Sequence, residues 1–433
     1  MNKQSLIVTL QKEQKQTTDE TVKNRLDILQ KYLQEYVQEY VQEKEYKNIP
    51  YDCLLSPFNT KEINYVAEQA QIQMTKAAYA ALVVVGIGGS HLCIQAVEQL
   101  LRGALTVNLT MPIYYVDTVD ADRLYRVRQL IQQIHIEHKE VLLIIISKSG
   151  ATIETVANTA VLLKEFSGKQ IKDSVICVTN MHSSLYKWAQ KYEVRTFSIP
   201  QAVGGRFSAF TAVGLFPLAC LGIDIIQLCA GASAYDWTKD DAALRATWLY
   251  GAIQKNVPIH DLFLTATDSF SLGLWYRQLM GETIGKKRVQ KDVVSAVGLM
   301  PTVSLCSTDL HSVGQLYIAG PDVRVTTFVT IPSQTTVAIP SSDIMKMLNP
   351  VLQNKSINQI LDAITHGTMQ TYAQHNLSYT HIHFPEKSAF FVGQFMYMAM
   401  VEMIYLARLL DINPFDQPEV ELYKQATREF LVK

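Results

Sequence analysis

Short apolar segments alternate with amphipathic segments along most of the chain, and this alternation predicts its fold. Residues 141–146 read Val-Leu-Leu-Ile-Ile-Ile, an unbroken apolar run that predicts a strand buried on both faces of a parallel sheet. Residues 81–85 form a similar run. Further strands are predicted at 112–116, 174–178, 194–199, 261–265, 293–297 and 323–330, and helices at 92–101, 121–135, 155–166, 184–191, 208–218 and 270–281. This βα pattern is typical of a doubly wound α/β fold.

Longer helices are predicted near both ends of the chain. Between residues 18 and 45, apolar side chains recur at steps of three and four and form one stripe: Val22, Leu26, Leu29, Leu33, Tyr36 and Tyr40. Residues 389–410 are almost continuously apolar, which predicts a buried helix. Pro418 is well placed in the first turn of a final helix.

Composition narrows the class of protein. The 433 residues suggest two or three domains, and 39 Lys and Arg against 40 Asp and Glu give a net charge of −1. This balance offers no electrostatic attraction for nucleic acid or a membrane surface. The six cysteines lack C-x-x-C spacing, and no signal peptide or apolar run of 18 residues is present. We therefore expect a soluble cytoplasmic protein with reduced thiols.

Two loops at predicted strand ends carry candidate chemistry. Ser147, Lys148, Ser149 and Thr152 follow the strand at 141–146, where hydroxyls, an ammonium and a helix start can bind a phosphate. The loop lacks the spacing of a nucleotide P-loop, and an ordinary capped βα turn is the alternative. The segment Gly86-Ile-Gly-Gly-Ser90 follows the strand at 81–85 and misses the dinucleotide fingerprint. Together the loops predict one ligand at two neighbouring strand ends.

Four charged residues of the second half are unremarkable when each is taken alone. Arg206 follows two glycines, Glu282 ends a predicted helix, His311 precedes a serine, and Lys424 lies on the final helix. An arginine at a glycine corner often pairs with a carboxylate, a lone histidine is usually structural, and exposed Glu and Lys are the norm.

Taken together, six segments in one order resemble the phosphoglucose isomerase (glucose-6-phosphate isomerase) family in its shorter bacterial form, from about residue 50 to the C-terminus. The segments are Gly86-Ile-Gly-Gly-Ser90, Ser147-Lys-Ser-Gly-Ala-Thr152, Gly204-Gly-Arg-Phe-Ser208, Gly281-Glu-Thr-Ile-Gly-Lys286, Asp309-Leu-His-Ser312 and Asn413-Pro-Phe-Asp-Gln-Pro418.

The resemblance implies two sugar-isomerase (SIS-like) domains, each a mainly parallel sheet flanked by helices. We expect an N-terminal helical segment at 1–50, a first domain with the phosphate loop at 51–203, a second domain at 204–385, and C-terminal helices at 386–433 that complete the site.

The resemblance also implies the reaction: reversible isomerisation of glucose 6-phosphate and fructose 6-phosphate through a cis-enediol, in glycolysis and gluconeogenesis, without metal or organic cofactor. By family match, His311 and Lys424 open the sugar ring, Glu282 shuttles the proton between C2 and C1, and Arg206 stabilises the charge that develops on the enediolate. The expected sugar-phosphate contacts are Gly89, Ser90, Ser147, Lys148, Ser149, Thr152, Gln278 and Gln417.

Family members form homodimers in which a partner histidine completes each site, so His311 is expected to act across an interface. Two alternatives stay open. A bifunctional phosphoglucose/phosphomannose isomerase shares the chemistry but diverges in these motifs. A non-catalytic sugar-phosphate sensor would need the phosphate loop but not Glu282, His311 and Lys424 together.

Overall fold

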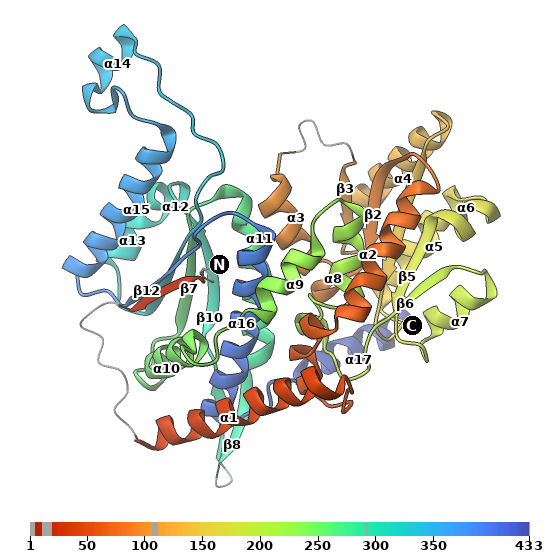
Figure 1. The fold of residues 1–433 in the computed structure, drawn as a ribbon, viewed down its shortest axis with the longest axis horizontal. Helices are drawn as coiled ribbons and strands as arrows, with labels where there is room; N and C mark the ends of the chain where they lie inside the picture. The colour runs from red at the N-terminus through yellow and green to blue at the C-terminus, as the bar shows by residue number, and fades with distance from the viewer. Residues whose placement is uncertain (1–4, 11–19, 106–110, 291–292, 433) are drawn as a thin grey trace.

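A computed structural model of the chain describes residues 5–10, 20–105, 111–290 and 293–432. Two five-stranded sheets lie side by side, and helices pack between them and over their outer faces (Figure 1). This arrangement confirms the predicted α/β class with parallel sheets flanked by helices.

The first sheet is entirely parallel and has the strand order β3-β2-β4-β5-β6. Its strands are β2 (Tyr79–Val85), β3 (Ile113–Val116), β4 (Glu140–Ile146), β5 (Val175–Thr179) and β6 (Arg195–Ser198). Its helices are α2 (Thr60–Thr75), α3 (Leu92–Arg102), α4 (Ala121–Ile136), α5 (Ile153–Leu162), α6 (Gly168–Ser174), α7 (Ser184–Lys191) and α8 (Ala212–Cys220).

Strand β4 is buried on both faces, as its continuous apolar sequence predicts. Leu143 and Ile145 belong to one core cluster together with residues of α4 and α7, whereas Leu142 and Ile144 belong to a second cluster with residues of α3 and α8. Because successive side chains of a strand point to opposite faces, this run needs apolar partners on both sides. The parallel sheet with helices on both faces supplies them.

The second sheet has the order β1-β12-β11-β7-β10, and only β1 pairs antiparallel. Its strands are β1 (Ile7–Leu10), β7 (Ile259–Leu264), β10 (Met300–Leu305), β11 (Arg324–Thr330) and β12 (Tyr379–His383). The helices of this half are α9 (Ile225–Ser233), α10 (Asp241–Gln254), α11 (Phe270–Ile284), α12 (Thr308–Ser312), α13 (Gly314–Ala319), α14 (Asp343–Leu348) and α15 (Ile357–Gln374).

Two predicted elements need correction. Residues 293–297 do form a strand, but this β9 (Val293–Val297) pairs antiparallel with β8 (Lys286–Gln290) in a projecting hairpin outside the main sheet. Its side chains are largely exposed, so the apolar pattern here does not mark a core position. The N-terminal segment, expected to be helical, also contributes β1 to the second sheet. This strand of four residues forms only because β12, from the far end of the chain, lies beside it.

The long helices behave as their apolar patterns predict. Within α1 (Glu20–Glu43) the stripe of six expected residues is buried, and the expected start at Thr18 lies outside the described residues. Helix α16 (Ala389–Leu410) is long and apolar enough to cross a membrane, yet 89% of its most apolar window is buried inside this protein. A side chain at Gly393 would collide with the Leu228 carbonyl 1.8 Å away, so glycine permits α16 to pack closely on α9.

Candidate functional site

The loops after β2 and β4 meet, as predicted from their positions at the carboxyl ends of parallel strands. The two strands are hydrogen-bonded neighbours, with Val85 opposite Ile145. The strand order reverses here, since β3 lies on the far side of β2 and β5 on the far side of β4. In open α/β sheets, ligands bind at such a switch point.

A cavity of about 480 Å³ opens between these loops. Ser90, Ser147, Lys148, Ser149 and Thr152, all predicted contacts, line it. The structure adds lining residues that the sequence reasoning missed: Ile87, Ile146, Thr155, Asn180, His182, Ser183 and Gln201. Asn180 directly follows β5, the strand beside β4, so the rule that ligands lie at carboxyl ends could have identified it.

Hydrogen bonds within the loop at 147–152 fix its conformation beside the cavity. Ser147 Oγ accepts a hydrogen bond from the Gly150 amide at 3.1 Å and lies 3.1 Å from Thr152 Oγ1. Thr152 occupies the N-cap position of α5, but its side chain makes no capping hydrogen bond. The helix N-terminus therefore remains available to a bound anion.

Lys148 reaches the end of the predicted first domain. Its ammonium donates to the Val203 carbonyl at 2.9 Å, just before the Gly204-Gly205 corner. Burial lowers the pKa of Lys148 below its ordinary value. A bound phosphate would supply the negative charge that this half-buried cation lacks.

The Gly204-Gly205 corner places Arg206 next to the loop at 86–90. A Cβ atom at Gly89 would lie 2.2 Å from the Gly205 carbonyl, so only glycine permits the two loops to approach this closely. Arg206, in the short turn η5 (Gly205–Phe207), is 1% exposed. It donates to Glu282 Oε2 at 3.2 Å and to Thr283 Oγ1 at 3.0 Å, and both acceptors lie at the end of α11.

Glu282 lies between two donors and keeps partial access to solvent. Gln278 Nε2 donates to Glu282 Oε1 at 2.8 Å, and the Glu282 side chain is 29% exposed. Gln278 also lies against the first loop, since a Cβ at Gly88 would be 2.8 Å from Gln278 Nε2. The Oε1 atom of Gln278 is buried and has no hydrogen-bond partner in the described part of the chain. The structure thus brings Gly89, Arg206, Gln278 and Glu282 together.

The segment at 413–417 packs against the Arg206 guanidinium. The guanidinium donates to the main-chain carbonyls of Pro414 and Asp416, which places the segment that carries Gln417 next to the corner. Lys286, which the site prediction did not include, donates to Asp416 and to the Asn413 carbonyl. Burial lowers the pKa of Lys286, and Asp416 opposes the shift. This lysine anchors the segment.

His311 lies apart from this corner. A Cβ atom at Gly281 would lie 3.8 Å from the ring of Pro301, near the start of β10, whereas His311 lies on α12 beyond the end of the same strand. A strand of six residues spans roughly 15–20 Å, so one chain does not bring His311 to Glu282. His311 is exposed, and the neighbouring Asp309 carboxylate is bound to the Leu305 amide and to Ser312.

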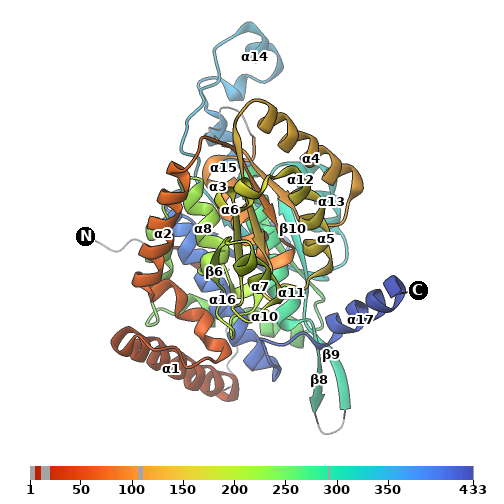
Figure 2. The ribbon, with the colours of Figure 1, turned by 90° about the vertical axis from the view of Figure 1, so that its right-hand side faces the viewer.

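Lys424 also lies outside the packed corner. It sits on α17 (Pro418–Val432), which has no buried residue within its described length and projects from the body of the molecule (Figure 2). The ammonium pairs with Glu421 of the same helix at 2.7 Å, and its side chain is 39% exposed. Glu419 at the start of α17 pairs with Lys287 of β8 at 2.9 Å.

Comparison with known sequences identifies relatives over most of the chain. The family model described as phosphoglucose isomerase matches residues 61–283, a span that includes Arg206 and Glu282. A glucose-6-phosphate isomerase from Carboxydothermus hydrogenoformans is 32% identical over 395 residues, which cover 85% of this chain and 83% of the relative. One from Mycoplasma capricolum is 30% identical over 384 residues, covering 85% and 86%.

Solved structures share the fold. A hypothetical protein from Thermus thermophilus superposes with a TM-score of 0.82 at 25% identity, covering 99% of this chain and 100% of that one. A glucose-6-phosphate isomerase from Chlamydia trachomatis gives a TM-score of 0.74 at 20% identity, covering 88% and 74%. Two sheets in one chain are thus a shared architecture.

Proposed function

The chain belongs to the phosphoglucose isomerase family, and from this premise we propose which of its residues carry the family's reaction. The protein is an aldose–ketose isomerase that interconverts glucose 6-phosphate and fructose 6-phosphate in glycolysis and gluconeogenesis. The observation that supports the residue assignment is the Arg206–Glu282 pair, held 3.2 Å apart beside the loop at 86–90.

In the proposed site, the sugar phosphate binds with its phosphate group in the loop at 147–152. Four side chains there, Ser147, Lys148, Ser149 and Thr152, supply hydroxyl or ammonium donors, and the start of α5 adds backbone amides. The sugar extends from this loop toward Gly89, Ser90, Gln278 and Gln417. The unpaired Oε1 of Gln278 is then available to a sugar hydroxyl.

Glu282 is the proposed acid–base group of the proton transfer. As a carboxylate it takes the proton from C2 of the open-chain aldose and returns it to C1 on the same face of the planar enediol. The C1 oxygen gains a proton and the C2 oxygen becomes the ketone, so the isomerisation is a redistribution within one molecule. Arg206 lies beside Glu282 and provides a fixed positive charge for the enediolate oxygens.

Ring opening is assigned to His311 and Lys424. Because His311 lies beyond the far end of β10, we propose that the protein is a homodimer in which His311 of one copy completes the site of the other. Lys424 would approach the sugar if α17 packed toward the corner. The segment at 413–417, which leads into α17, is hydrogen-bonded to Arg206, so the start of the helix lies close to the corner.

The proposed location is the cytoplasm. All six cysteines are buried and unpaired, which is typical of a protein that works in a reducing compartment.

The decisive experiment measures conversion of fructose 6-phosphate, coupled to glucose-6-phosphate dehydrogenase, for the wild type and Glu282→Gln. We expect the substitution to lower kcat by about 10²–10⁴-fold, the usual contribution of a general base. Sugar-phosphate binding, followed by calorimetry, should stay nearly unchanged. Glu68→Gln makes the same change at an exposed position of α2 and should have no effect.

Two outcomes would contradict the assignment. Full activity of Glu282→Gln would remove Glu282 from the proton transfer. A folded wild type that binds sugar phosphate without turnover would favour the sensor function instead.

A further inference from the structure

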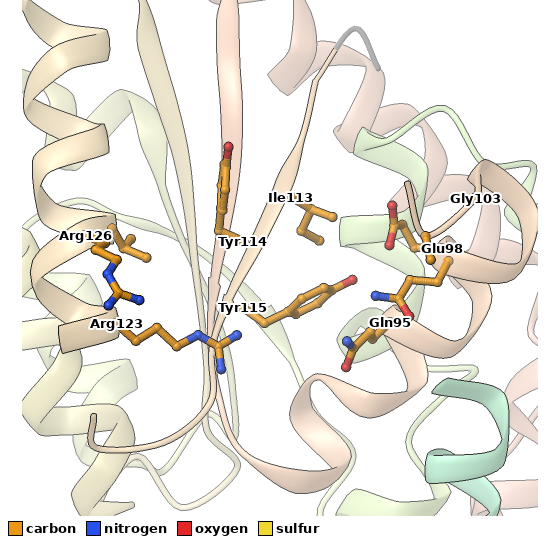
Figure 3. Close-up of a pocket in the computed structure, with 11 residues that line it drawn as sticks. Gln95, Glu98, Gly103, Ile113, Tyr114, Tyr115, Arg123 and Arg126 are labelled. Carbon is orange, nitrogen blue, oxygen red and sulfur yellow. The ribbon is translucent and has the colours of Figure 1, made fainter. Parts of the chain in front are cut away.

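A second cavity, of about 350 Å³, lies between α3, the edge strand β3 and α4 (Figure 3). It shares no lining residue with the 480 Å³ cavity between the loops at 86–90 and 147–152, called the sugar cavity below. Eleven residues line it: Gln95, Glu98, Gln99, Gly103, Ala104, Ile113, Tyr114, Tyr115, Arg123, Arg126 and Val127. Nothing in the isomerisation chemistry requires this cavity.

A buried hydroxyl without a partner points into it. Tyr115 is 7% exposed, and its hydroxyl makes no hydrogen bond with any described residue. In Figure 3 the Tyr115 ring extends from β3 toward Gln95 and Glu98 on α3. A buried hydroxyl left unpaired is unfavourable, and a polar group of a ligand in the cavity would satisfy it.

Glu98 presents a second buried polar group. Its side chain is 4% exposed, and the nearest cation, Arg102, lies 3.5 Å away. Burial raises the pKa of Glu98 to about 7, with Arg102 opposing the shift. Near neutral pH this carboxyl can both accept a hydrogen bond from a ligand hydroxyl and donate one to it.

The charges around the cavity do not cancel. Glu98 faces Arg102, and Arg123 pairs with Asp117 at 2.8 Å. Arg126, which enters the cavity wall from α4, has no ion pair within the described part of the chain. One positive charge is therefore left over, and this favours a ligand that carries an anionic group.

We propose that the α3–β3–α4 cavity binds a small anion that also carries hydroxyl groups, such as a polyol phosphate or a hydroxy acid. The anionic group lies near Arg126, and the hydroxyls meet Tyr115, Glu98 and Gln95. The cavity volume falls in the usual range for small-molecule sites. This inference does not depend on the isomerase reaction.

The test follows methyl NMR signals of the full-length protein during titration with glycerol 3-phosphate and with D-glycerate. Ile113 and Val127 line the proposed cavity, whereas Ile87 lines the sugar cavity, so the signals that move identify the site. The stronger of the two probes identifies the anionic group as phosphate or carboxylate. Glycerol lacks the anionic group and inorganic phosphate lacks the polyol hydroxyls, so each should bind at least about tenfold more weakly.

Variants separate this site from non-specific binding. Tyr115→Phe removes only the hydroxyl, and Arg126→Gln removes the charge while it keeps a polar side chain. Each should raise Kd about tenfold, as for loss of a hydrogen bond to a charged partner. Tyr125→Phe makes the first change at an exposed tyrosine of α4 outside the cavity and should leave Kd unchanged. The proposal is overturned if only the Ile87 signals move, if no signals move, or if both cavity variants bind like the wild type.

Discussion

The corner around Arg206 and the two helices that carry His311 and Lys424 differ in how firmly the chain holds them. Arg206 is fully buried and bonded to α11 and to the segment at 413–417. Helix α11 is itself tied into the core, because Tyr276 belongs to a buried network with Arg245 and Glu402.

By contrast, α12 and α17 leave their catalytic candidates outside the packed core. His311 is exposed on a helix of five residues, and α17 buries none of its described residues. Packing fixes the first region within one chain, whereas neither helix has comparable contacts. In the proposed assignment, the groups for proton transfer and charge stabilisation are therefore held within one chain, whereas ring opening would require a further arrangement of the chains.

Exchange of subunits tests this difference most strongly. We expect His311→Ala to lower activity by about 10²–10⁴-fold, since it removes a general acid–base group. Heterodimers of His311→Ala with Glu282→Gln, isolated with two different tags, should regain activity. One of their two sites would combine an intact Glu282 with an intact His311 from the other chain. Heterodimers as inactive as both parents would place His311 in the site of its own chain.

A conservative change at the packed corner comes next. Arg206→Lys keeps the charge but cannot reproduce the contacts to Glu282, Thr283 and the Pro414 carbonyl together, and we expect kcat to fall about 10²–10³-fold. Steady-state kinetics of the coupled reaction measure this loss. Arg277→Lys, at an exposed position of the same helix α11, is the matched control. A change of less than a few-fold would show that the fixed geometry of the guanidinium is unimportant.

Substitutions in the loop at 147–152 should change KM more than kcat. Lys148→Ala removes one charged donor, so KM should rise about tenfold or more while kcat changes less. Lys187→Ala, an exposed lysine on α7, should leave both constants unchanged. An unaltered KM in Lys148→Ala would contradict the loop as the phosphate site.

The smallest predicted effect concerns pH. Burial lowers the pKa of Lys148, so this ammonium loses its proton, and with it the attraction for phosphate, at a lower pH than an exposed lysine does. The KM of the wild type should therefore rise with pH already below the ordinary lysine pKa of about 10, and more steeply than the KM of Lys148→Ala. Parallel profiles for the two proteins would show that Lys148 does not titrate against the substrate.

Much of the lining of the candidate phosphate cavity was predictable because its loops follow strands with clear apolar patterns. Ser90 and the residues of the loop at 147–152 come directly after β2 and β4, and parallel strands bring such loops to one edge. Asn180 was missed although it directly follows β5. His182 and Gln201 carry no motif, and only the adjacency of β5 and β6 brings them to the cavity. The role of Thr283 as a partner of Arg206 was also invisible in the sequence.

The sequence by itself determined much of the local structure: the core strands and the helices that follow them, the positions of the glycine loops, and the residue types that these loops present. Periodicities of about 2.0 and 3.6 residues are local properties, so they can be recognised without knowledge of the fold. Only the tertiary structure decided that Arg206 meets Glu282, 76 residues away, and Pro414, 208 residues away. It also decided that β1 pairs with β12, and that the end of α11 lies near the start of β10 whereas α12 follows the end of that strand. Such contacts depend on how whole sheets and helices pack against one another, which no local pattern specifies.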